Sequence, residues 1–219
     1  NKVIADGFPF SLTIGIYASL VVVFAGILFG SVCALRQNKL IDRFFMVLST
    51  LGSTIPSFVL ATGFLFLFSK TLGLVPAFGV DEVAGYIGPV LVIGAFPLSF
   101  ITRLTRTSLV EVQQQDYIRT ARSKGISEFK VIYKHALRNA LLPVVTYIGP
   151  MVASIVTGSF VIETVFGIPG VGQLFTDSIV NRDYPLIMGI TVFFAVLLVL
   201  AVLIVDLVYV LIDPRIKLD

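Results

Sequence analysis

The sequence predicts an all-α integral membrane protein with five transmembrane helices. Hydrophobic residues make up 57% of the 219 residues and charged residues only 13%, whereas a soluble domain carries about 25% charged residues. The apolar residues form five blocks without a charge, at 7–35, 44–69, 83–102, 139–162 and 184–205. Each block has the length that a helix needs to cross a hydrocarbon core, about 20 residues. Barrel strands would span about ten residues and alternate polar with apolar side chains, and these blocks do not alternate.

The basic residues of the polar segments indicate which side of the membrane each segment faces. Thirteen Lys and Arg residues lie in segment 36–43, segment 103–138 and the C-terminal tail, which alternate correctly with the spans. Only three lie on the opposite side: Lys2, Lys70 and Arg182. Because cytoplasmic loops are enriched in Lys and Arg, we expect the N-terminus of this chain outside and its C-terminus in the cytoplasm. The net charge of +3 follows from this enrichment and does not indicate nucleic-acid binding.

Proline and small residues inside the blocks predict how the helices bend and pack. Pro56, Pro97 and Pro150 predict bends, because a membrane helix tolerates Pro where neighbours satisfy the freed carbonyl groups. Gly26 and Gly30 are four residues apart, a spacing that lets two helix backbones approach closely. The spacing alone leaves two alternatives open, packing inside the chain and contact with another subunit.

The long basic segment 103–138 predicts a helix, a turn and a second helix. Residues 111–124 contain neither Pro nor Gly, and Gly125 suits the left-handed residue that ends a helix. Ser127 is the expected N-cap of the second helix. Apolar residues then recur at steps of three and four, and this helix is expected to continue into the fourth span near Pro143.

Two stretches of this segment carry a family resemblance. They are 116–125, Asp-Tyr-Ile-Arg-Thr-Ala-Arg-Ser-Lys-Gly, and 135–143, His-Ala-Leu-Arg-Asn-Ala-Leu-Leu-Pro. Together they resemble the cytoplasmic loop of the membrane subunits of ATP-binding-cassette (ABC) importers, which holds a Glu-Ala-Ala-type sequence, a Gly and a later Leu-Pro. Ala121, Gly125 and the Leu-Pro at 142–143 match that pattern.

Departures from the general pattern narrow the resemblance to one branch of these importers. Arg119 and Thr120 stand where the generic family has Glu and Ala, and the spacing from Gly to Leu-Pro is longer. Both departures are shared with peptide, nickel and glutathione importers. Segments 157–175, 181–184 and 213–215 resemble further landmarks of the same branch. The resemblance covers nearly the whole chain and is strongest to the B-type permease subunit of oligopeptide importers.

The resemblance implies the permease core of an ABC importer, with five transmembrane helices and a cytoplasmic helix-turn-helix coupling loop at about 103–138. Residues 1–219 would form a single transmembrane permease domain of the bacterial cytoplasmic (inner) membrane, in contact with membrane lipid. Members usually have one more N-terminal span, so we expect part of the full-length protein to precede Asn1.

The resemblance also implies that the chain is one part of a larger machine. A second, homologous permease subunit would complete the translocation pathway. Two ABC ATPase subunits would bind beneath it, and an extracytoplasmic substrate-binding protein would deliver the substrate. The expected substrate is an oligopeptide. Dipeptides, nickel chelates and glutathione remain alternatives, because their importers share this loop.

The helix before Gly125 is the expected ATPase-coupling element, since the resemblance implies that it inserts into a groove on an ATPase subunit. The coupling residues are Arg119, Thr120, Ala121, Arg122, Ser123, Lys124 and Gly125. Gly125 is also explained as an ordinary helix-ending glycine, and the two roles are compatible. Arg122 and Lys124 either pair with acidic groups of the ATPase or serve only as solvated determinants of topology. On polarity alone, the pathway-lining candidates are Ser57, Thr146, Ser154 and Thr157.

No motif for catalysis, metal binding or cofactor binding occurs in the sequence. The phosphate-binding pattern Gly-x-x-x-x-Gly-Lys-Ser/Thr is absent, so we expect no ATP hydrolysis by this chain. His135 is the single histidine and has no nucleophile or metal partner. Cys33 is the single cysteine, which excludes an internal disulfide. Glu163 and Asp206 lie at the ends of spans, where we expect both to be hydrated and Asp206 to pair with an interfacial base.

Two other function classes fit the sequence less well. An ion-coupled secondary transporter predicts ionisable residues near the membrane midplane or paired broken helices. An intramembrane enzyme needs a catalytic pair at that depth, and the five apolar blocks contain no charged residue. Co-purification of two ATPase subunits would separate a translocation subunit from both classes.

Overall fold

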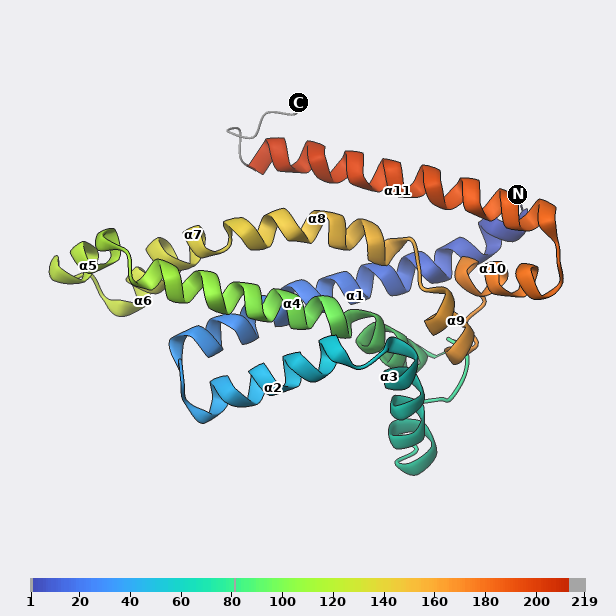
Figure 1. The fold of residues 1–219 in the computed structure, drawn as a ribbon, viewed down its shortest axis with the longest axis horizontal. Helices are drawn as coiled ribbons and strands as arrows, with labels where there is room; N and C mark the ends of the chain where they lie inside the picture. The colour runs from blue at the N-terminus through green and yellow to red at the C-terminus, as the bar shows by residue number, and fades with distance from the viewer. Residues whose placement is uncertain (1, 81, 213–219) are drawn as a thin grey trace. The chain divides into compact units, whose positions relative to one another are not determined.

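The computed structural model describes residues 2–80 and 82–212, except for the side chains of residues 206 and 208–212. Every regular element in these residues is helical, as the sequence predicts (Figure 1). In chain order the elements are α1 (Lys2–Leu35), α2 (Leu40–Thr54), α3 (Ser57–Phe64), η1 (Leu65–Thr71), η2 (Val83–Tyr86), α4 (Ile87–Gln113), α5 (Asp116–Ser123), α6 (Glu128–Lys130), η3 (Val131–Leu137), α7 (Arg138–Ala140), α8 (Leu142–Val156), α9 (Phe160–Phe166), α10 (Val171–Val180) and α11 (Tyr184–Ile212).

Three stretches of helix are long and apolar enough to cross a membrane: Lys2–Leu35, Val83–Gln113 and Tyr184–Val205. Two further spans arise if each of two bent helix pairs crosses as one. These pairs are Leu40–Thr54 with Ser57–Thr71 and Glu128–Ala140 with Leu142–Val156. With both pairs included, the described residues hold up to five spans, which coincide with the five apolar blocks of the sequence.

The second apolar block is broken rather than continuous. Its two helices meet at 110° around Pro56, whereas the two helices of the fourth span meet at 51°. Pro56 has the extended ψ of 142° that precedes a new helix, and it cannot donate the backbone hydrogen bond that would continue α2. By contrast, α4 and α8 run through Pro97 and Pro150 without interruption. Three prolines predicted bends, and of these Pro56 lies at a break between two helices. The sequence did not indicate that Pro56 would differ from Pro97 and Pro150 in this way.

The chain divides into two compact units. Unit 1 comprises residues 1–21, 55–95 and 149–219, and unit 2 comprises residues 22–54 and 96–148. The residues of helices α1, α4 and α8 are each divided between the two units. The loop that carries the coupling residues lies wholly within unit 2.

In unit 2, the two glycines of α1 allow close packing against α4. A Cβ atom at Gly26 would lie 2.6 Å from Ile101 Cγ2, and one at Gly30 would lie 2.6 Å from the carbonyl oxygen of Thr102. Real side chains do not approach this closely, so both positions require glycine at this helix separation. The predicted close approach is confirmed, and of the two alternatives it serves packing inside the chain.

In unit 1, the segment after α8 forms two short helices instead of an open loop. Helix α10 packs against α9 and α11, and α9 packs against α3. Gly167 ends α9 with a left-handed φ of 60°, and a 3.0 Å hydrogen bond joins the Gly79 N–H to the Phe166 carbonyl oxygen. These contacts fix the ends of α9, from which Glu163 projects.

Candidate functional site

The predicted helix-turn-helix is present in unit 2, with one difference at its start. The sequence predicts a single helix over 111–124, but α4 ends at Gln113 and α5 begins at Asp116. Gly125 follows with a φ of 75°, as its predicted role requires. Ser127 occupies the predicted N-cap position of α6, yet its side chain makes no capping hydrogen bond. The Ser127 side chain therefore does not contribute a cap to the turn.

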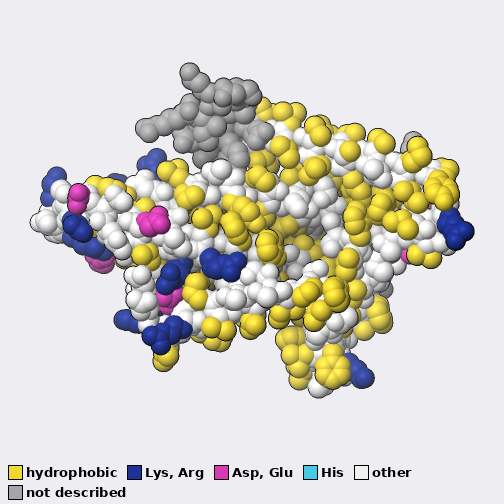
Figure 2. All heavy atoms as spheres, viewed as in Figure 1, with side chains coloured by type: hydrophobic (Ala, Val, Ile, Leu, Met, Phe, Trp, Pro, Cys, Tyr) yellow, Lys and Arg dark blue, Asp and Glu magenta, His cyan; other side chains and the backbone are white. Residues whose placement is uncertain are grey.

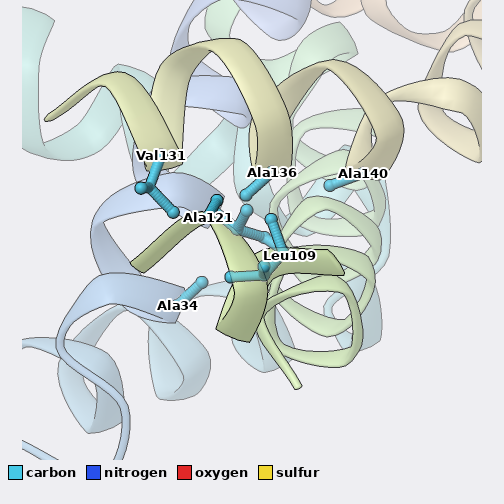
Figure 3. Close-up of a cluster of buried hydrophobic side chains, with 7 residues drawn as sticks. Ala34, Leu109, Ala121, Val131, Ala136 and Ala140 are labelled. Carbon is cyan, nitrogen blue, oxygen red and sulfur yellow. The ribbon is translucent and has the colours of Figure 1, made fainter. Parts of the chain in front are cut away.

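A cluster of small and aliphatic side chains holds this loop together, and we name it the loop core (Figure 3). Its members come from the end of α1, from α4, from α5 and from the helix after the turn. They are Ala34, Leu109, Ile118, Ala121, Val131, Ala136 and Ala140. Ile118 and Ala121 lie three residues apart, so both project from the same face of α5. Their burial fixes α5 against η3 and α4.

The loop core separates the coupling candidates into one buried and six exposed residues. Ala121 is 7% exposed and contacts its own chain. The exposed candidates are Arg119, Thr120, Arg122, Ser123, Lys124 and Gly125. Ala121 thus sets the position of α5, and the residues around it supply the surface that a partner can reach. A Cβ atom at Gly125 would meet no other atom within 4 Å, so the requirement for glycine there comes from its φ alone.

Arg122 has an internal partner across the turn. Its Nη2 and Nε donate to the Glu128 carboxylate at 2.7 and 3.1 Å, and this hydrogen-bonded partner raises the pKa of Arg122 above its already high value. The second ion pair of the loop, Arg119 with Asp116 at 3.6 Å, is highly exposed and contributes little. In addition, the Asn139 amide donates to the Tyr117 hydroxyl at 2.9 Å and ties α5 to α7.

A buried ion pair beneath the loop escaped the sequence interpretation, which counted its arginine only as a topology determinant. Arg106 donates to both Asp42 carboxylate oxygens, at 2.6 and 2.7 Å. The Asp42 side chain is 3% exposed and also accepts from the Asn38 N–H at 2.8 Å. The pair joins the start of α2 to α4, which leads directly into α5. Asp42 is the one acidic residue of the basic segment 36–43. This was the sequence feature that could have suggested an ion pair.

The pathway-lining candidates are divided between the two units. Thr146 lies in unit 2 and donates to the Leu142 carbonyl oxygen at 3.1 Å. In unit 1, Thr157 donates to the Ser154 carbonyl oxygen at 2.7 Å, so these two residues lie within one helical turn. Ser57 begins α3 in the same unit. The proposed lining role therefore remains a prediction for each of them.

Glu163 corrects a second expectation, because it is not hydrated. It is 1% exposed and accepts from the backbone N–H groups of Gly172 at 2.8 Å and Gln173 at 3.2 Å. These belong to the first turn of α10, whose N–H groups have no partner within the helix. The third such group, on Val171, donates to Ser11 Oγ at 3.0 Å. Burial raises the pKa of Glu163, while hydrogen bonds from Ser11 and from three backbone N–H groups oppose that rise.

The glycines around Glu163 make room for its carboxylate. A Cβ atom at Gly158 would lie 2.7 Å from Glu163 Oε1, and one at Gly172 would lie 2.9 Å from Oε2. A Cβ atom at Gly170 would collide with both Glu163 and Ser11. The Gly-rich spacing of 158–172 is therefore explained by a buried carboxylate that caps α10.

The remaining titratable candidates form no further site. Cys33 is fully buried and His135 is partly buried. Within residues 2–80 and 82–212, no group of three His, Cys, Asp or Glu residues could hold a metal ion. The Asp206 side chain and segment 213–219 lie outside the described residues, so the expected pairing of Asp206 stays a prediction.

Comparison with known proteins gives consistent results at the level of sequence. A family model described as "Binding-protein-dependent transport system inner membrane component" matches residues 26–218. The chain is 50% identical over 218 residues to the dipeptide transport system permease protein DppB of Bacillus subtilis (strain 168), covering 100% of this chain and 71% of that protein. It is 43% identical over 219 residues to the oligopeptide transport system permease protein OppB of Haemophilus influenzae, covering 99% and 72%.

Solved structures show the same fold at low identity. A chain of the MetNI methionine ABC transporter in an inward-facing conformation matches with a TM-score of 0.74 and 16% identity, over 94% of each chain. A chain of an amino acid ABC transporter matches with a TM-score of 0.73 and 15% identity, over 98% of this chain and 94% of the other. At these identities the likeness concerns the fold.

Proposed function

We propose how this chain works on the basis of its family. The chain belongs to the family of binding-protein-dependent transport system inner membrane components. It is a multi-pass permease subunit of a peptide ABC importer. Its relatives are named for dipeptide and for oligopeptide transport. Membership of this family decides against the two competing classes, the ion-coupled secondary transporter and the intramembrane enzyme.

For the substrate, the proposal is an oligopeptide, with dipeptides as the main alternative and nickel chelates or glutathione as further ones. Competition for uptake by cells that depend on this importer would test it. Unlabelled penta- or hexapeptides should suppress uptake of a labelled oligopeptide, and dipeptides should not. No uptake of the labelled oligopeptide, together with uptake of a labelled dipeptide that only unlabelled dipeptides suppress, would transfer the proposal to the dipeptide class.

For the mechanism, the proposal is that α5 couples the permease to an ATPase subunit. One observation carries it: the loop core buries Ile118 and Ala121 and leaves the opposite face of a short basic helix exposed. Figure 2 shows dark blue Lys and Arg side chains around α5 and α6, at the left of the view. A helix packed on one side and exposed on the other can transmit a push from a partner to α4.

The proposed partners follow from the same family. ATP would be hydrolysed by two separate ATPase subunits in the cytoplasm, and a second permease subunit would complete the pathway. A substrate-binding protein would deliver the peptide from outside. In the proposed orientation the N-terminus of this chain faces outside, and the loop 103–138 faces the cytoplasm.

Charge reversal on the exposed face of α5 tests the coupling proposal. The variant Arg119→Glu/Lys124→Glu changes two exposed side chains outside the loop core. In the assembled complex it should lose ATPase subunits during purification and lose substrate-stimulated ATP hydrolysis. The control Lys70→Glu/Arg182→Glu alters two bases of the opposite side and should retain both properties. Normal ATPase retention and hydrolysis in the α5 variant would refute the coupling role.

A further inference from the structure

Two large aromatic side chains stand exposed on the second helix of the loop, and we name this pair the aromatic ledge. Phe129 is 68% exposed and Tyr133 is 59% exposed. Their ring centroids lie 4.5 Å apart with the planes inclined by 33°, so the rings form one continuous apolar surface. The same helix buries Val131, Ala136 and Ala140 in the loop core. The ledge is therefore additional to the face that holds the helix in place.

Basic side chains accompany the ledge. Lys130 and Lys134 follow the two aromatic residues in sequence and are exposed. Glu128, the acidic neighbour of Phe129, already accepts two hydrogen bonds from Arg122. The ledge thus presents apolar rings beside two lysines for which the described residues show no ion pair. This combination complements an apolar recess with acidic side chains at its rim.

The position of the ledge favours a protein partner over the membrane. Ten residue steps lead from Phe129 to residue 139, where the apolar block begins, a path of at most about 15 Å along a helix. The helix pair is inclined by 51°, so if the span runs along the membrane normal, Phe129 lies at most about 9 Å beyond the start of the apolar block. The headgroup layer is only about 5–7 Å thick on each side. In that orientation Phe129 would reach the outer edge of the headgroup layer, where a protein partner can contact it.

The ledge also belongs to the same packed piece as α5. Ile118 and Ala121 of α5 meet Val131 and Ala136 of η3 in the loop core, and the hydrogen bond from Asn139 to Tyr117 joins the two helices again. A partner that engages α5 is therefore close to the helix that carries the ledge. Tyr is one of the residue types that most often dominate binding energy, and Phe is enriched in the cores of interfaces.

We propose that the aromatic ledge is a second anchor for the ATPase subunit. Phe129 and Tyr133 of this chain would insert into an apolar recess on the ATPase subunit, and acidic side chains would border that recess. This inference rests on the proposed coupling function of α5 and adds a contact that the coupling residues do not include. The α5 face would supply charge and the ledge would supply apolar burial. Both anchors together would resist rotation of the loop on its partner, which one short helix could not do.

Photo-crosslinking in the full importer complex tests the location of the ledge. Phe129→p-benzoylphenylalanine and Tyr133→p-benzoylphenylalanine should each give a covalent product with an ATPase subunit after illumination. Phe78→p-benzoylphenylalanine places the same group at another exposed aromatic position, 70% exposed and on the side proposed to be external, and should give no ATPase product. Products with lipid alone, or with the other permease alone, at positions 129 and 133 would overturn the proposal.

Retention of the ATPase subunits measures the contribution of the ledge. The variant Phe129→Ala/Tyr133→Ala should weaken ATPase binding to the purified permease pair at least about tenfold, the change expected from losing one dominant aromatic contact. Lys130→Glu/Lys134→Glu should weaken it in a salt-dependent way, and Phe78→Ala should leave it unchanged. If Arg119→Glu/Lys124→Glu loses ATPase binding while the ledge variants keep it, the ledge is refuted and the α5 coupling function stands. If all these variants keep ATPase binding, both fail.

Discussion

At the scale of single residues, Glu163 is a buried carboxylate, 1% exposed. Its carboxylate accepts from two N–H groups at the start of α10 and lies among three glycines. Glu163→Ala would leave those buried N–H groups without partners, which costs about 1–3 kcal/mol. We expect a lower melting temperature of the purified subunit in detergent. Ser11→Ala removes the acceptor of one N–H group and a hydrogen bond to Glu163 but leaves the Glu163 carboxylate on α10, so it should have the smaller effect. An unchanged melting temperature for both variants would contradict the capping role.

The same residue predicts a pH dependence with a definite sign. Burial raises the pKa of Glu163 above its ordinary value of 4.5, so between these two values the folded protein binds more protons than the unfolded chain. Stability should therefore fall as pH rises through that window and should stay level above it. Glu163→Gln, which cannot titrate, should lack this component in melting curves measured across the window. An identical pH profile in the variant would show that Glu163 keeps its ordinary pKa.

At the scale of elements, the ion pair between Asp42 and Arg106 joins α2 to α4. Asp42→Ala would leave Arg106 without its partner, and Arg106 is only 22% exposed. Removing one member of a fully buried pair costs about 3–5 kcal/mol, and the partial exposure of Arg106 lowers our expectation to about 2–3 kcal/mol. Chemical unfolding of the subunit should show this loss. Asp42→Leu/Arg106→Leu should recover much of it, because neither charge is then left unpaired, and failure to recover would point to a role beyond the pair.

The turn between α5 and α6 depends on the backbone of Gly125. Because a Cβ atom at this residue would have no neighbouring atom within 4 Å, a side chain there meets strain but no collision. Gly125→Val should lose substrate uptake and substrate-stimulated ATP hydrolysis at matched expression, since a β-branched residue disfavours a φ of 75°. Gly125→Asn should retain most activity, because Asn tolerates the left-handed region. Equal activity of the two variants, whether both active or both inactive, would show that the backbone conformation is not the deciding factor.

Local patterns predicted the elements of this fold, and contacts between distant segments decided the rest. Block lengths predicted the helices, the spacing of Gly26 and Gly30 predicted close packing, and Gly125 predicted the turn. The burial of Ala121 was not predictable from the loop alone, because its contact partners come from three other elements. Asp42 and Arg106 are 64 residues apart, so neither their pairing nor their burial follows from local sequence.

For Glu163, local sequence suggested exposure, and a contact with a later helix produced burial instead. Its position at the end of an apolar block suggested hydration, since interfacial carboxylates normally contact water. The helix that buries it, α10, begins eight residues later and folds back upon it. The glycines at 158, 170 and 172 were visible in the sequence. They were the one local indication that a buried side chain needs room in this segment.

At the scale of the whole molecule, the proposed topology predicts which segments reagents can reach. With Cys33→Ser as background, Ser123→Cys should react with an impermeant thiol reagent only after the membrane is opened. Asp177→Cys should react in sealed cells, and its polar position on α10 makes it the matched external probe. Labelling of Ser123→Cys in sealed cells would reverse the assignment of the loop to the cytoplasm.

The hydrogen bond between Ser11 and Val171 has a consequence for biosynthesis. It joins residues 160 positions apart, and ribosomes add about 5–20 residues per second. The first helix is thus made about 8–30 seconds before its hydroxyl can meet the N–H of Val171. When residue 171 is added, four of the five apolar blocks have been made, and until then the packing around Ser11 is incomplete. A chaperone or protease that surveys this packing could distinguish a completed subunit from a truncated one, although both would already be inserted in the bilayer.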